Sequence, residues 1–444
     1  MLSKVHAPRL IKPMHKLAKI SLLLLTLPCL ALDHAHFMEL NKKASAFAKQ
    51  QDWKSLRESL IEIANELPTP TPIYMLRMAS VETHLGNKAE ALKWMDRYAA
   101  TGLTYDVTKD DDLKPLAGDK DYQPIAARMD AQTKPISKAE VACTLPVADL
   151  MPEDLTYLAD AKTFVVSSIQ HHTLYRATLP KTAGADCTLQ EIPLEAGIRQ
   201  WPVAAVSADA KRKLIWMTIA AFPGFAGLPK EDQGKTALVA VDPKSGKVIK
   251  RFDLASEAQG LFGDMSVTKD GTVYVTDGLG GGVYRVAGDL GSAKLEKIAD
   301  GLFSPQTPAL ARDGKRLFVA DYTIGIAVID LASGKVTYLP HPENFAVTGL
   351  DGLFLTGDSL IGVQNGTDPE RIIRLRLNPE QTSITSLEVV EQNTPRLGEP
   401  THAVEVDGMI YVTANVGWGK IDDTGKLKPN EQFTKPILLR FPAK

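Results

Sequence analysis

The stretch GDMSVTKDGTVYVTD, residues 263–277, decides the fold. It holds a short run with apolar residues, a tight Asp-Gly turn and a stronger apolar run, which is the pattern of a β-hairpin. Five further stretches repeat it: PEDLTYLADAKTFVVSS (152–168), WPVAAVSADAKRKLIWMT (201–218), QTPALARDGKRLFVAD (306–321), DGLFLTGDSLIGVQN (351–365) and PTHAVEVDGMIYVTAN (400–415). Most copies continue into a third and a fourth expected strand, so the repeating unit is a four-stranded sheet.

Six such units at a spacing of roughly 40–60 residues are typical of the blades of a β-propeller. The sequence therefore predicts a mainly β fold with a six-bladed β-propeller over residues 137–444. A closed ring limits the number of unpaired strand edges. We expect strands at 140–145 and 436–441, from the two ends of the array, to complete one shared blade and seal the ring.

The repeat also predicts which residues meet at one mouth of the central channel. In each blade the second strand returns to the face at which the first strand starts. The residues before the first strands are Glu153, Pro202, Gly263, Gln306, Asp351 and Pro400, with Asp154, Asp264, Thr307 and Thr401 one step on. The residues after the second strands include Ser168, Asp277, Asp321, Asn365 and Asn415. This oxygen-rich mouth suits a hard divalent cation.

Two interpretations of the acidic residues stay open at this point. Asp277 and Asp321 follow their strands, where aspartate commonly caps turns by accepting hydrogen bonds from backbone amides, and we expect a structural role for both. Glu153 and Asp351 precede their strands, where a role in turn formation explains them less well. Contact with a metal or a substrate is the alternative for these two.

Four phrases resemble one family of six-bladed propellers, the senescence marker protein/gluconolactonase/luciferin-regenerating family. They are PED (152–154), GDMSVTKDGTVYVTD (263–277), SPQTPALARDGKRLFVAD (304–321) and LDGLFL (350–355). The resemblance extends over about residues 140–444. It implies one divalent metal held by a glutamate, asparagines and an aspartate, and a lactonase activity in which the aspartate assists water.

The resemblance places the implied metal ligands on particular residues. Glu153 and Asp351 fall on the glutamate and aspartate positions. The asparagine positions fall on Gly263, which has no ligand atom in its side chain, and on Gln306, so the chain departs from the family pattern there. With Asp264 beside Gly263, the implied ligands are Glu153, Gln306, Asp351 and Asp264. The implied cation is calcium, magnesium, manganese or zinc.

Two residues are candidates for catalysis. Asp351 is expected to act on water, and His402, at the start of the last repeat, is a candidate base or ligand. A packing histidine is the alternative interpretation of His402. Asn365, which follows the second strand of its repeat, is expected to contact the substrate.

Aromatic residues in two loops predict a cover over the same mouth. The link AAFPGFAGLPKEDQG (220–234) is unusually long and carries Phe222 and Phe225. Exposed aromatic rings on a loop indicate a lid or a partner contact. Trp418, in the sequence NVGWGK, is expected to join them.

Residues 36–133 precede the repeats and have helical periodicity. Apolar residues recur at helical spacing from Leu40 to Ile63, and a second helix pair follows Thr-Pro-Thr-Pro at 69–72. The pattern predicts a small tetratricopeptide-like α-helical domain. The helical hairpins either bind a protein partner or serve as a packing adaptor for the propeller.

Residues 1–31 are typical of a secretory signal peptide, with basic residues before a short apolar run. The run is too short for a comfortable membrane span. We expect cleavage after Ala31 and an exported protein, periplasmic or secreted, without a stable membrane span. A lipoprotein site at Cys29 and a retained anchor are the alternatives. Export would place Cys143 and Cys187 in an oxidising compartment, where the two thiols either pair or stay free.

Charge and motifs exclude several classes of function. The 51 basic and 53 acidic side chains give a net charge of −2, without the basic surplus of a protein that binds nucleic acid. The sequence has no Gly-x-Ser-x-Gly, phosphate-binding loop or paired-Cys zinc pattern. Two functions remain: a metal-assisted hydrolase of small lactones or esters, and a non-catalytic periplasmic module that binds a small molecule or a protein.

Overall fold

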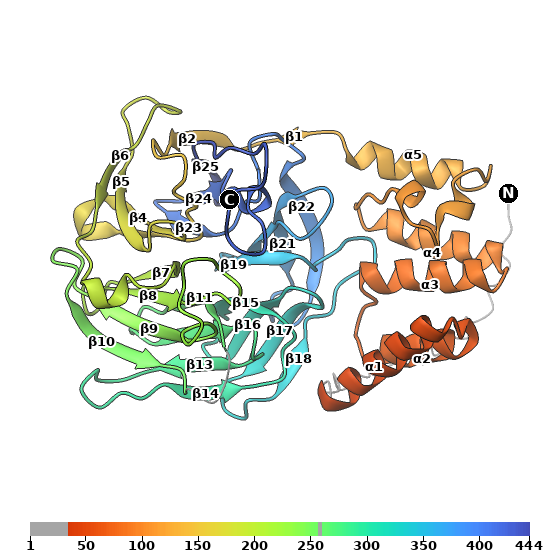
Figure 1. Cartoon of the computed structure of the whole chain (residues 1–444), viewed down its shortest axis with the longest axis horizontal. Coiled ribbons are helices and arrows are strands. Elements are labelled where there is room, and N and C mark those ends of the chain that lie inside the picture. Colours follow the sequence, from red (N-terminus) through yellow and green to blue (C-terminus); the bar gives the residue numbers. More distant parts are fainter. Residues whose placement is uncertain (1–33, 256–259) are drawn as a thin grey trace, which may run out of the picture.

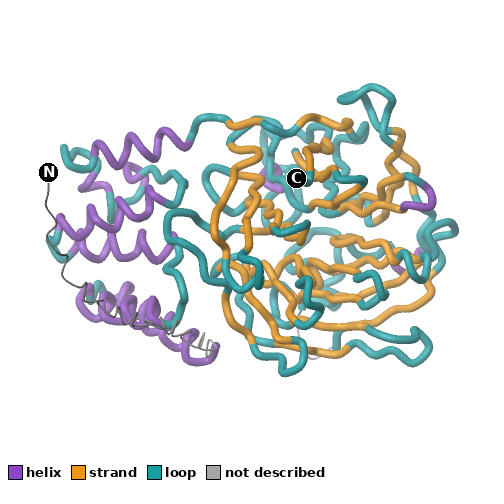
Figure 2. Tube along the Cα trace, turned by 180° about the vertical axis from the view of Figure 1, so that it is seen from behind, coloured by secondary structure: helices purple, strands orange, loops and turns teal. Residues whose placement is uncertain are grey.

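The computed structural model describes residues 34–255 and 260–444. Helices come first along the chain and six sheets follow (Figure 1). From the opposite side, the helices gather at one end of the molecule and the strands make up the rest (Figure 2). The expected signal segment, residues 1–31, lies outside the described residues. None of the described helices has the length and apolar character needed to cross a membrane.

The N-terminal segment confirms the predicted helical region. Its α-helices are α1 (His34–Gln50), α2 (Trp53–Asn65), α3 (Pro72–His84), α4 (Lys88–Ala100) and α5 (Gln123–Gln132). Two of them begin at a side-chain cap, because Asp52 accepts from the Ser55 amide before α2 and Thr71 accepts from the Tyr74 amide in α3. Helices α1 and α2 pack together, as do α3 and α4. The tetratricopeptide character of these hairpins stays a prediction.

The six sheets are the blades of the predicted propeller, which the structure confirms. Blade one holds β3 (Leu155–Leu158), β4 (Thr163–Ser168), β5 (Thr173–Thr178) and β6 (Thr188–Glu191). Blade two holds β7 (Val203–Asp209), β8 (Leu214–Ala220), β9 (Thr236–Val241) and β10 (Val248–Asp253). Blade three holds β11 (Phe262–Val267), β12 (Val273–Asp277), β13 (Val283–Val286) and β14 (Glu296–Ala299).

Blade four holds β15 (Pro305–Leu310), β16 (Arg316–Asp321), β17 (Gly325–Asp330) and β18 (Val336–Tyr338). Blade five holds β19 (Leu350–Thr356), β20 (Ser359–Gln364), β21 (Arg371–Leu377) and β22 (Ile384–Gln392), and β1 (Ile136–Ser137) adds a fifth strand at its outer edge. Blade six holds β23 (Ala403–Val406), β24 (Met409–Ala414) and β25 (Ile437–Pro442), with β2 (Glu140–Thr144) as its outermost strand. Paired strands run antiparallel in every blade.

The ring closes as predicted, through a blade built from both ends of the array. Strand β2 pairs antiparallel with β25, with Glu140 opposite Arg440 and Thr144 opposite Ile437. The innermost strands of blades six and one, β23 and β3, also contact each other. Ring closure removes the open edges at the ends of the array, which would otherwise be templates for aggregation.

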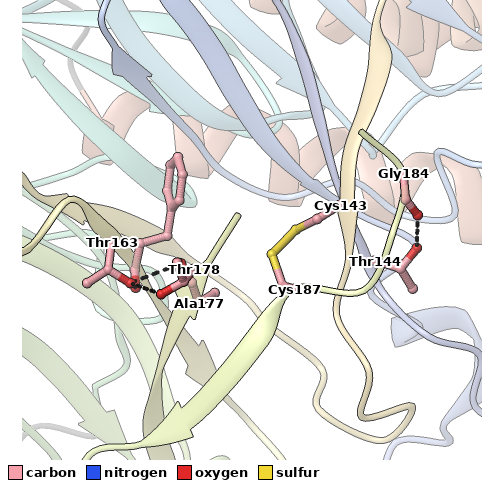
Figure 3. Close-up of a disulfide and its surroundings, with 8 residues drawn as sticks. Cys143, Thr144, Thr163, Ala177, Thr178, Gly184 and Cys187 are labelled. Atoms are coloured by element: carbon pink, nitrogen blue, oxygen red, sulfur yellow. Dashed lines mark hydrogen bonds between the residues drawn. A yellow bond between two sulfur atoms is a disulfide. The ribbon is translucent and has the colours of Figure 1, made fainter. Parts of the chain in front are cut away.

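A disulfide between Cys143 and Cys187 reinforces this closure (Figure 3). Cys143 lies in β2, the closing strand, and Cys187 directly precedes β6 in blade one. The two Cα atoms are 5.5 Å apart and both side chains are buried. The structure thus settles the pairing that the sequence left open, because the closing strand brings two cysteines 44 residues apart into contact.

The hydrophobic cores lie between neighbouring blades. Each main cluster of buried apolar side chains in the propeller joins two adjacent sheets, such as blades one and two, or blades four and five. Between blades six and one, the rings of Phe164 and Tyr411 lie 4.7 Å apart, centroid to centroid. The apolar area of a blade is buried only where the blade packs on its neighbours. This packing holds the inner strands in place around the channel.

A β-bulge recurs in blades two to five, where the inner strand reaches one mouth of the channel. In blade two, Val203 pairs with Ile219 and Val206 with Met217, so Ala204 and Ala205 lie opposite one residue. Shifts at the same place occur in blades three, four and five, between Phe262/Met265, Pro305/Pro308 and Leu350/Leu353. A bulge bends its strand and re-aims side chains, here toward the channel.

The helical segment rests on blades four and five. The ring of Phe37 meets that of Phe303 at 5.0 Å, and the Thr104 amide donates to the Asp368 carbonyl at 2.7 Å. Arg371, a fully buried residue of β21, donates from Nη1 to the Gly102 carbonyl at 3.3 Å. Backbone and side-chain contacts therefore dock the helices on the propeller, in line with the expected role as a packing adaptor.

Candidate functional site

The bulges place the mouth residues in two rings of six. The first ring is Glu153, Ala204, Gly263, Gln306, Asp351 and Thr401, and the second ring is Asp154, Ala205, Asp264, Thr307, Gly352 and His402. Blades one and six fit this register, since the Asp154 and His402 amides bind the hydroxyls of Ser167 and Thr413. The Ala205 amide likewise binds Thr218 Oγ1. The sequence pattern placed Pro202 and Pro400 in the first ring, and the structure corrects both positions. The bulge in blade two puts Ala204 there, and the hydrogen bond of the His402 amide to Thr413 puts Thr401 there in blade six.

Three side chains from three blades meet at the centre of this mouth. One ligand atom each from Glu153, Asp351 and His402 lies within 4.8 Å of the other two. Asp264 joins them, with Oδ1 2.7 Å from His402 Nε2. The sequence predicted all four residues for the site, but it did not predict that His402 stands among the carboxylates as their direct neighbour.

His402 is held in a fixed orientation. Its backbone amide donates to Thr413 Oγ1 at 3.1 Å, and ring atom Nδ1 lies 2.8 Å from the Glu153 carbonyl oxygen. The other ring nitrogen, Nε2, is buried and has no partner in hydrogen-bond geometry among the described residues. Nε2 also lies 2.7 Å from Asp264 Oδ1, so the packing role that the sequence raised as the alternative stays a prediction beside that of a base or ligand.

A hydrogen-bond relay orients Asp351. Asn365 Nδ2 donates to Asp351 Oδ2 at 2.6 Å, and Tyr322 Oη donates to Asn365 Oδ1 at 3.0 Å. The structure places Asn365 against the Asp351 carboxylate, as an orienting residue, and the substrate contact expected from the sequence stays a prediction. Tyr322 was missed. The available signal was positional, because Tyr322 follows β16 at the place where Asn365 follows β20.

Glu153 is oriented from the lid side. The indole Nε1 of Trp418 donates to Glu153 Oε2, and the Thr401 hydroxyl donates to the Glu153 carbonyl. The ring of Trp418 lies 6.1 Å from that of Phe222 and 6.4 Å from that of Phe225. The three aromatic residues predicted as a lid are thus one cluster beside the carboxylates.

The remaining predicted residues have local partners. Gln306 lies in the first ring, but its amide nitrogen donates to Ser304 at 3.1 Å; its role as a ligand stays a prediction. Asp277 accepts from the amides of its own turn, and Asp321 accepts from the amides of residues 303 and 304. Asn415 bonds to Thr434 and the backbone of 435. Asp277 and Asp321 have the structural contacts that were expected.

Burial and mutual repulsion dominate the electrostatics of the centre. Burial, with the Asp351 charge second, raises the pKa of Glu153 to about 8. Burial also raises the pKa of Asp351 to about 7 and that of Asp154 to about 6. Burial alone would lower the pKa of His402, but the carboxylates of Asp264 and Asp154 outweigh it and hold that pKa well above its usual value.

The charges at the centre do not balance within the described chain. Four buried or nearly buried carboxyl groups surround one imidazole: Glu153, Asp154, Asp264 and Asp351 around His402. No lysine or arginine of the described residues forms an ion pair with them. Buried charges are costly unless they are paired or coordinate a metal. The donor set, two carboxylates and an imidazole nitrogen without a hydrogen-bond partner, fits a divalent cation.

Two cavities lie near this region. The central channel encloses about 830 Å³, and its wall includes Asp154, Thr307 and His402. A second cavity of about 480 Å³ has Phe225 of the lid and Phe433 in its wall, and none of its lining residues belongs to the centre. Cavities of this size accommodate small molecules, and the channel reaches the centre at His402.

Comparisons with known proteins find structures but no relatives by sequence. No protein-family model and no curated protein matches the chain. Solved structures that it resembles include a calcium-binding protein, regucalcin, from Agrobacterium tumefaciens C58 (15% identity, 68% of this chain and 92% of that chain, TM-score 0.47). A luciferin-regenerating enzyme is 12% identical, with 69% of this chain and 95% of that chain covered and a TM-score of 0.44. A putative oxidoreductase (glucose dehydrogenase) from Thermus thermophilus is 16% identical, with 68% of this chain and 98% of that chain covered and a TM-score of 0.44. The assignment of the fold therefore rests on the six sheets of the chain itself, and not on these matches.

Proposed function

We propose that this chain is a divalent-metal-dependent hydrolase of small lactones or esters. The observation that carries the proposal is the group of Glu153, Asp351 and His402, whose ligand atoms lie within 4.8 Å of one another in a buried, negatively charged mouth. The names of the similar structures, which include a luciferin-regenerating enzyme and a calcium-binding protein, agree with such a centre but do not decide it.

The arrangement assigns a role to each of the surrounding side chains. A divalent cation held by Glu153, Asp351 and His402 would polarise the carbonyl of a bound lactone or ester. Asp351 accepts the proton of the attacking water and returns it to the leaving oxygen, so that the acyl C–O bond breaks and a hydroxy acid, or an acid and an alcohol, results. Asn365 and Tyr322 hold the Asp351 carboxylate in position through their hydrogen bonds.

Metal binding and turnover test the proposal together. The protein is stripped with a chelator and titrated with calcium, magnesium, manganese or zinc, and bound metal and melting temperature are measured. A cation that binds the folded state stabilises it by about 2.7 kcal/mol at 100 times its Kd. A panel of γ- and δ-lactones and aryl esters then measures hydrolysis with and without metal. Failure of every cation to bind, or turnover that chelation leaves unchanged, would overturn the proposal.

Trp418→Phe should weaken metal binding without unfolding the protein. The substitution keeps an aromatic ring in the lid and removes the N–H that binds Glu153 Oε2. Loss of an outer partner of a metal ligand typically costs 10- to 100-fold in affinity, so we expect a rise of about 10-fold or more in Kd. Isothermal titration of the stripped protein measures it. Trp53→Phe, on α2 in the helical segment, is the control and should bind metal as the wild type does.

Metal binding should strengthen as pH rises from 6 to 8.5. The raised pKa values of Glu153 (about 8) and Asp351 (about 7) mean that protons compete for the ligands in this range. Because the folded-state pKa values exceed the unfolded ones, the same groups stabilise the metal-free fold at low pH, and this stability is lost as pH rises through 7 and 8. The melting temperature of the stripped protein should therefore fall with pH while the shift caused by metal grows. A metal-induced shift that does not change with pH would contradict this expectation.

Export belongs to the same proposal. The expected signal peptide lies outside the described residues, but the buried Cys143–Cys187 disulfide favours an oxidising compartment, the periplasm or the exterior. Cell fractionation of the tagged protein, with a mass measurement of the mature N-terminus, tests it.

A second candidate is a non-catalytic periplasmic module that binds a protein partner through its helices. The observation in its favour is a set of exposed apolar side chains on α1, α2 and α3, namely Met38, Ile61 and Ile73, of which Met38 and Ile73 line one groove. Beside Ile73 lies a groove of about 470 Å³ whose wall includes Trp53 and Arg77. Ile73→Asp should abolish crosslinking to such a partner and leave metal binding unchanged, whereas unchanged crosslinking would exclude this surface.

A further inference from the structure

The sixth blade supplies a nitrogen atom to a centre that otherwise presents oxygen. His402 is 3% exposed and stands in the second ring of the mouth, among carboxylates from blades one, three and five. Its neighbour in the first ring, Thr401, has its hydroxyl engaged by the Glu153 carbonyl. Among the side chains of blade six in the two rings, His402 is therefore the one with an atom left for a ligand.

The protonation of the neutral ring follows from its anchor. Nδ1 lies 2.8 Å from the Glu153 carbonyl oxygen, and a carbonyl oxygen can only accept a hydrogen bond. Nδ1 must then carry the hydrogen, and the lone pair of the neutral imidazole is on Nε2. A histidine whose other nitrogen donates to a backbone carbonyl is the usual arrangement of a metal ligand.

Nε2 is directed at the acidic centre without being satisfied there. It lies 2.7 Å from Asp264 Oδ1, but within the described chain it meets no acceptor in hydrogen-bond geometry. A ring nitrogen of His402 lies within 4.8 Å of a carboxylate oxygen of both Glu153 and Asp351, a span that one ion with ligands at about 2.0–2.4 Å can bridge. A buried nitrogen that faces the carboxylates outside hydrogen-bond geometry is thus a second observation, beside the acidic residues themselves, that points to a bound ion.

We propose that His402 is a metal ligand through Nε2 and that it makes the centre selective for a borderline transition-metal ion, Zn²⁺ or Co²⁺, over Ca²⁺ and Mg²⁺. Calcium and magnesium take oxygen ligands, whereas imidazole suits zinc and its neighbours. The oxygen-only ligand set that the sequence resemblance implied would not make this distinction. This inference rests on the proposed function, because it concerns the same metal centre.

The same histidine has a role in the metal-free centre. Without a cation, a proton on Nε2 leaves a positive ring beside Asp264 and offsets part of the negative charge. When M²⁺ binds, that proton is released to solvent and Nε2 becomes a ligand. The exchange replaces one unit of positive charge by two, which brings the buried centre closer to neutrality.

The experiment compares cations on the stripped full-length protein by calorimetric titration, with the Co²⁺ absorption spectrum as a structural readout. We expect Zn²⁺ and Co²⁺ to bind at least about 100-fold more tightly than Ca²⁺ and Mg²⁺. His402→Asn, which removes Nε2 and leaves the carboxylate oxygens in place, should lower Zn²⁺ affinity by roughly 100-fold and Ca²⁺ affinity by less than about threefold. His84→Asn is the control, because His84 also lies 2.8 Å from an aspartate oxygen but belongs to α3.

X-ray absorption of the Zn²⁺-loaded wild type keeps the test informative if His402→Asn fails to fold, since imidazole scattering is visible without any mutation. An oxygen-only shell, equal affinities for Ca²⁺ and Zn²⁺, or wild-type Zn²⁺ affinity in His402→Asn overturns the inference and leaves a metal-dependent hydrolase standing. Absence of binding by every cation overturns both proposals. Zn²⁺ bound through histidine, with no lactone or ester hydrolysed, supports the inference and overturns the function.

Discussion

Asp351→Asn should abolish the hydrolytic activity, with kcat/KM reduced by at least about 100-fold, the usual effect of losing a general base. In the proposed mechanism, the carboxylate is both a metal ligand, in the group with Glu153 and His402, and the acceptor of the proton from water. Asparagine has nearly the same shape and keeps a hydrogen-bond partner for Asn365. The metal-induced rise in melting temperature should disappear with the activity. Steady-state hydrolysis of the best lactone, with metal content measured on the same sample, checks this.

Asp351→Asn should not lower the melting temperature of the metal-free protein. Burial and neighbouring carboxylates raise the pKa of Asp351 to about 7, so above pH 7 its charge opposes folding. Asp351→Asn should then melt no lower than the wild type once metal is removed. Asp160→Asn, at an exposed position in blade one, should change neither activity nor metal binding. A variant that loses activity because it melts well below the wild type would show that Asp351 acts on the fold.

Removal of the disulfide should lower the free energy of unfolding by about 4 kcal/mol. Cys143 and Cys187 close a loop across 44 residues, and this loop length corresponds to about 4 kcal/mol of lost chain entropy in the unfolded state. The variant is Cys143→Ala with Cys187→Ala, because both side chains are buried among apolar neighbours. Denaturant unfolding of the wild type and the double variant, both stripped of metal, measures the difference.

The location of the disulfide predicts where the loss should appear. Cys143 lies in β2, which is joined to blade six by its pairing with β25 and to blade one by the disulfide. Amide hydrogen exchange should therefore accelerate first in β2 and β25 of the double variant, while β11 and β12 in blade three keep their protection. Uniform acceleration in all six blades would show instead that the disulfide stabilises the ring as one unit.

Much of the fold was predictable because its signals are local. Alternating apolar residues around an Asp-Gly turn, as in 263–277, specify a hairpin without reference to the rest of the chain. Six copies give six blades, and β2, the strand left at the start of the array, completes the last blade by pairing with β25 at the other end of the chain. The same alignment brought Glu153, Asp264 and Asp351 to one mouth, and the structure places all three carboxyl groups near His402.

The register of the mouth was less predictable. The bulges in blades two to five insert one extra residue, so the start of the apolar run does not fix which residue faces the channel. That is why Pro202 was placed where Ala204 lies. In blade six, the hydrogen bond of the His402 amide to Thr413 puts Thr401, and not Pro400, in the first ring. Tyr322 was missed for a related reason, since its contact with Asn365 joins blades four and five and leaves no local pattern.

The sequence by itself determined the six-bladed propeller, the helical segment before it and the acidic mouth, because hairpins, helices and repeats are specified by residues that lie close together in the sequence. Only the tertiary structure decided how that mouth is completed. His402 and Trp418 reach Glu153 across 249 and 265 residues of chain, and such contacts exist only once the last blade has closed against the first. Ring closure therefore adds the imidazole of His402 to an acidic mouth, because it brings the two ends of the propeller together.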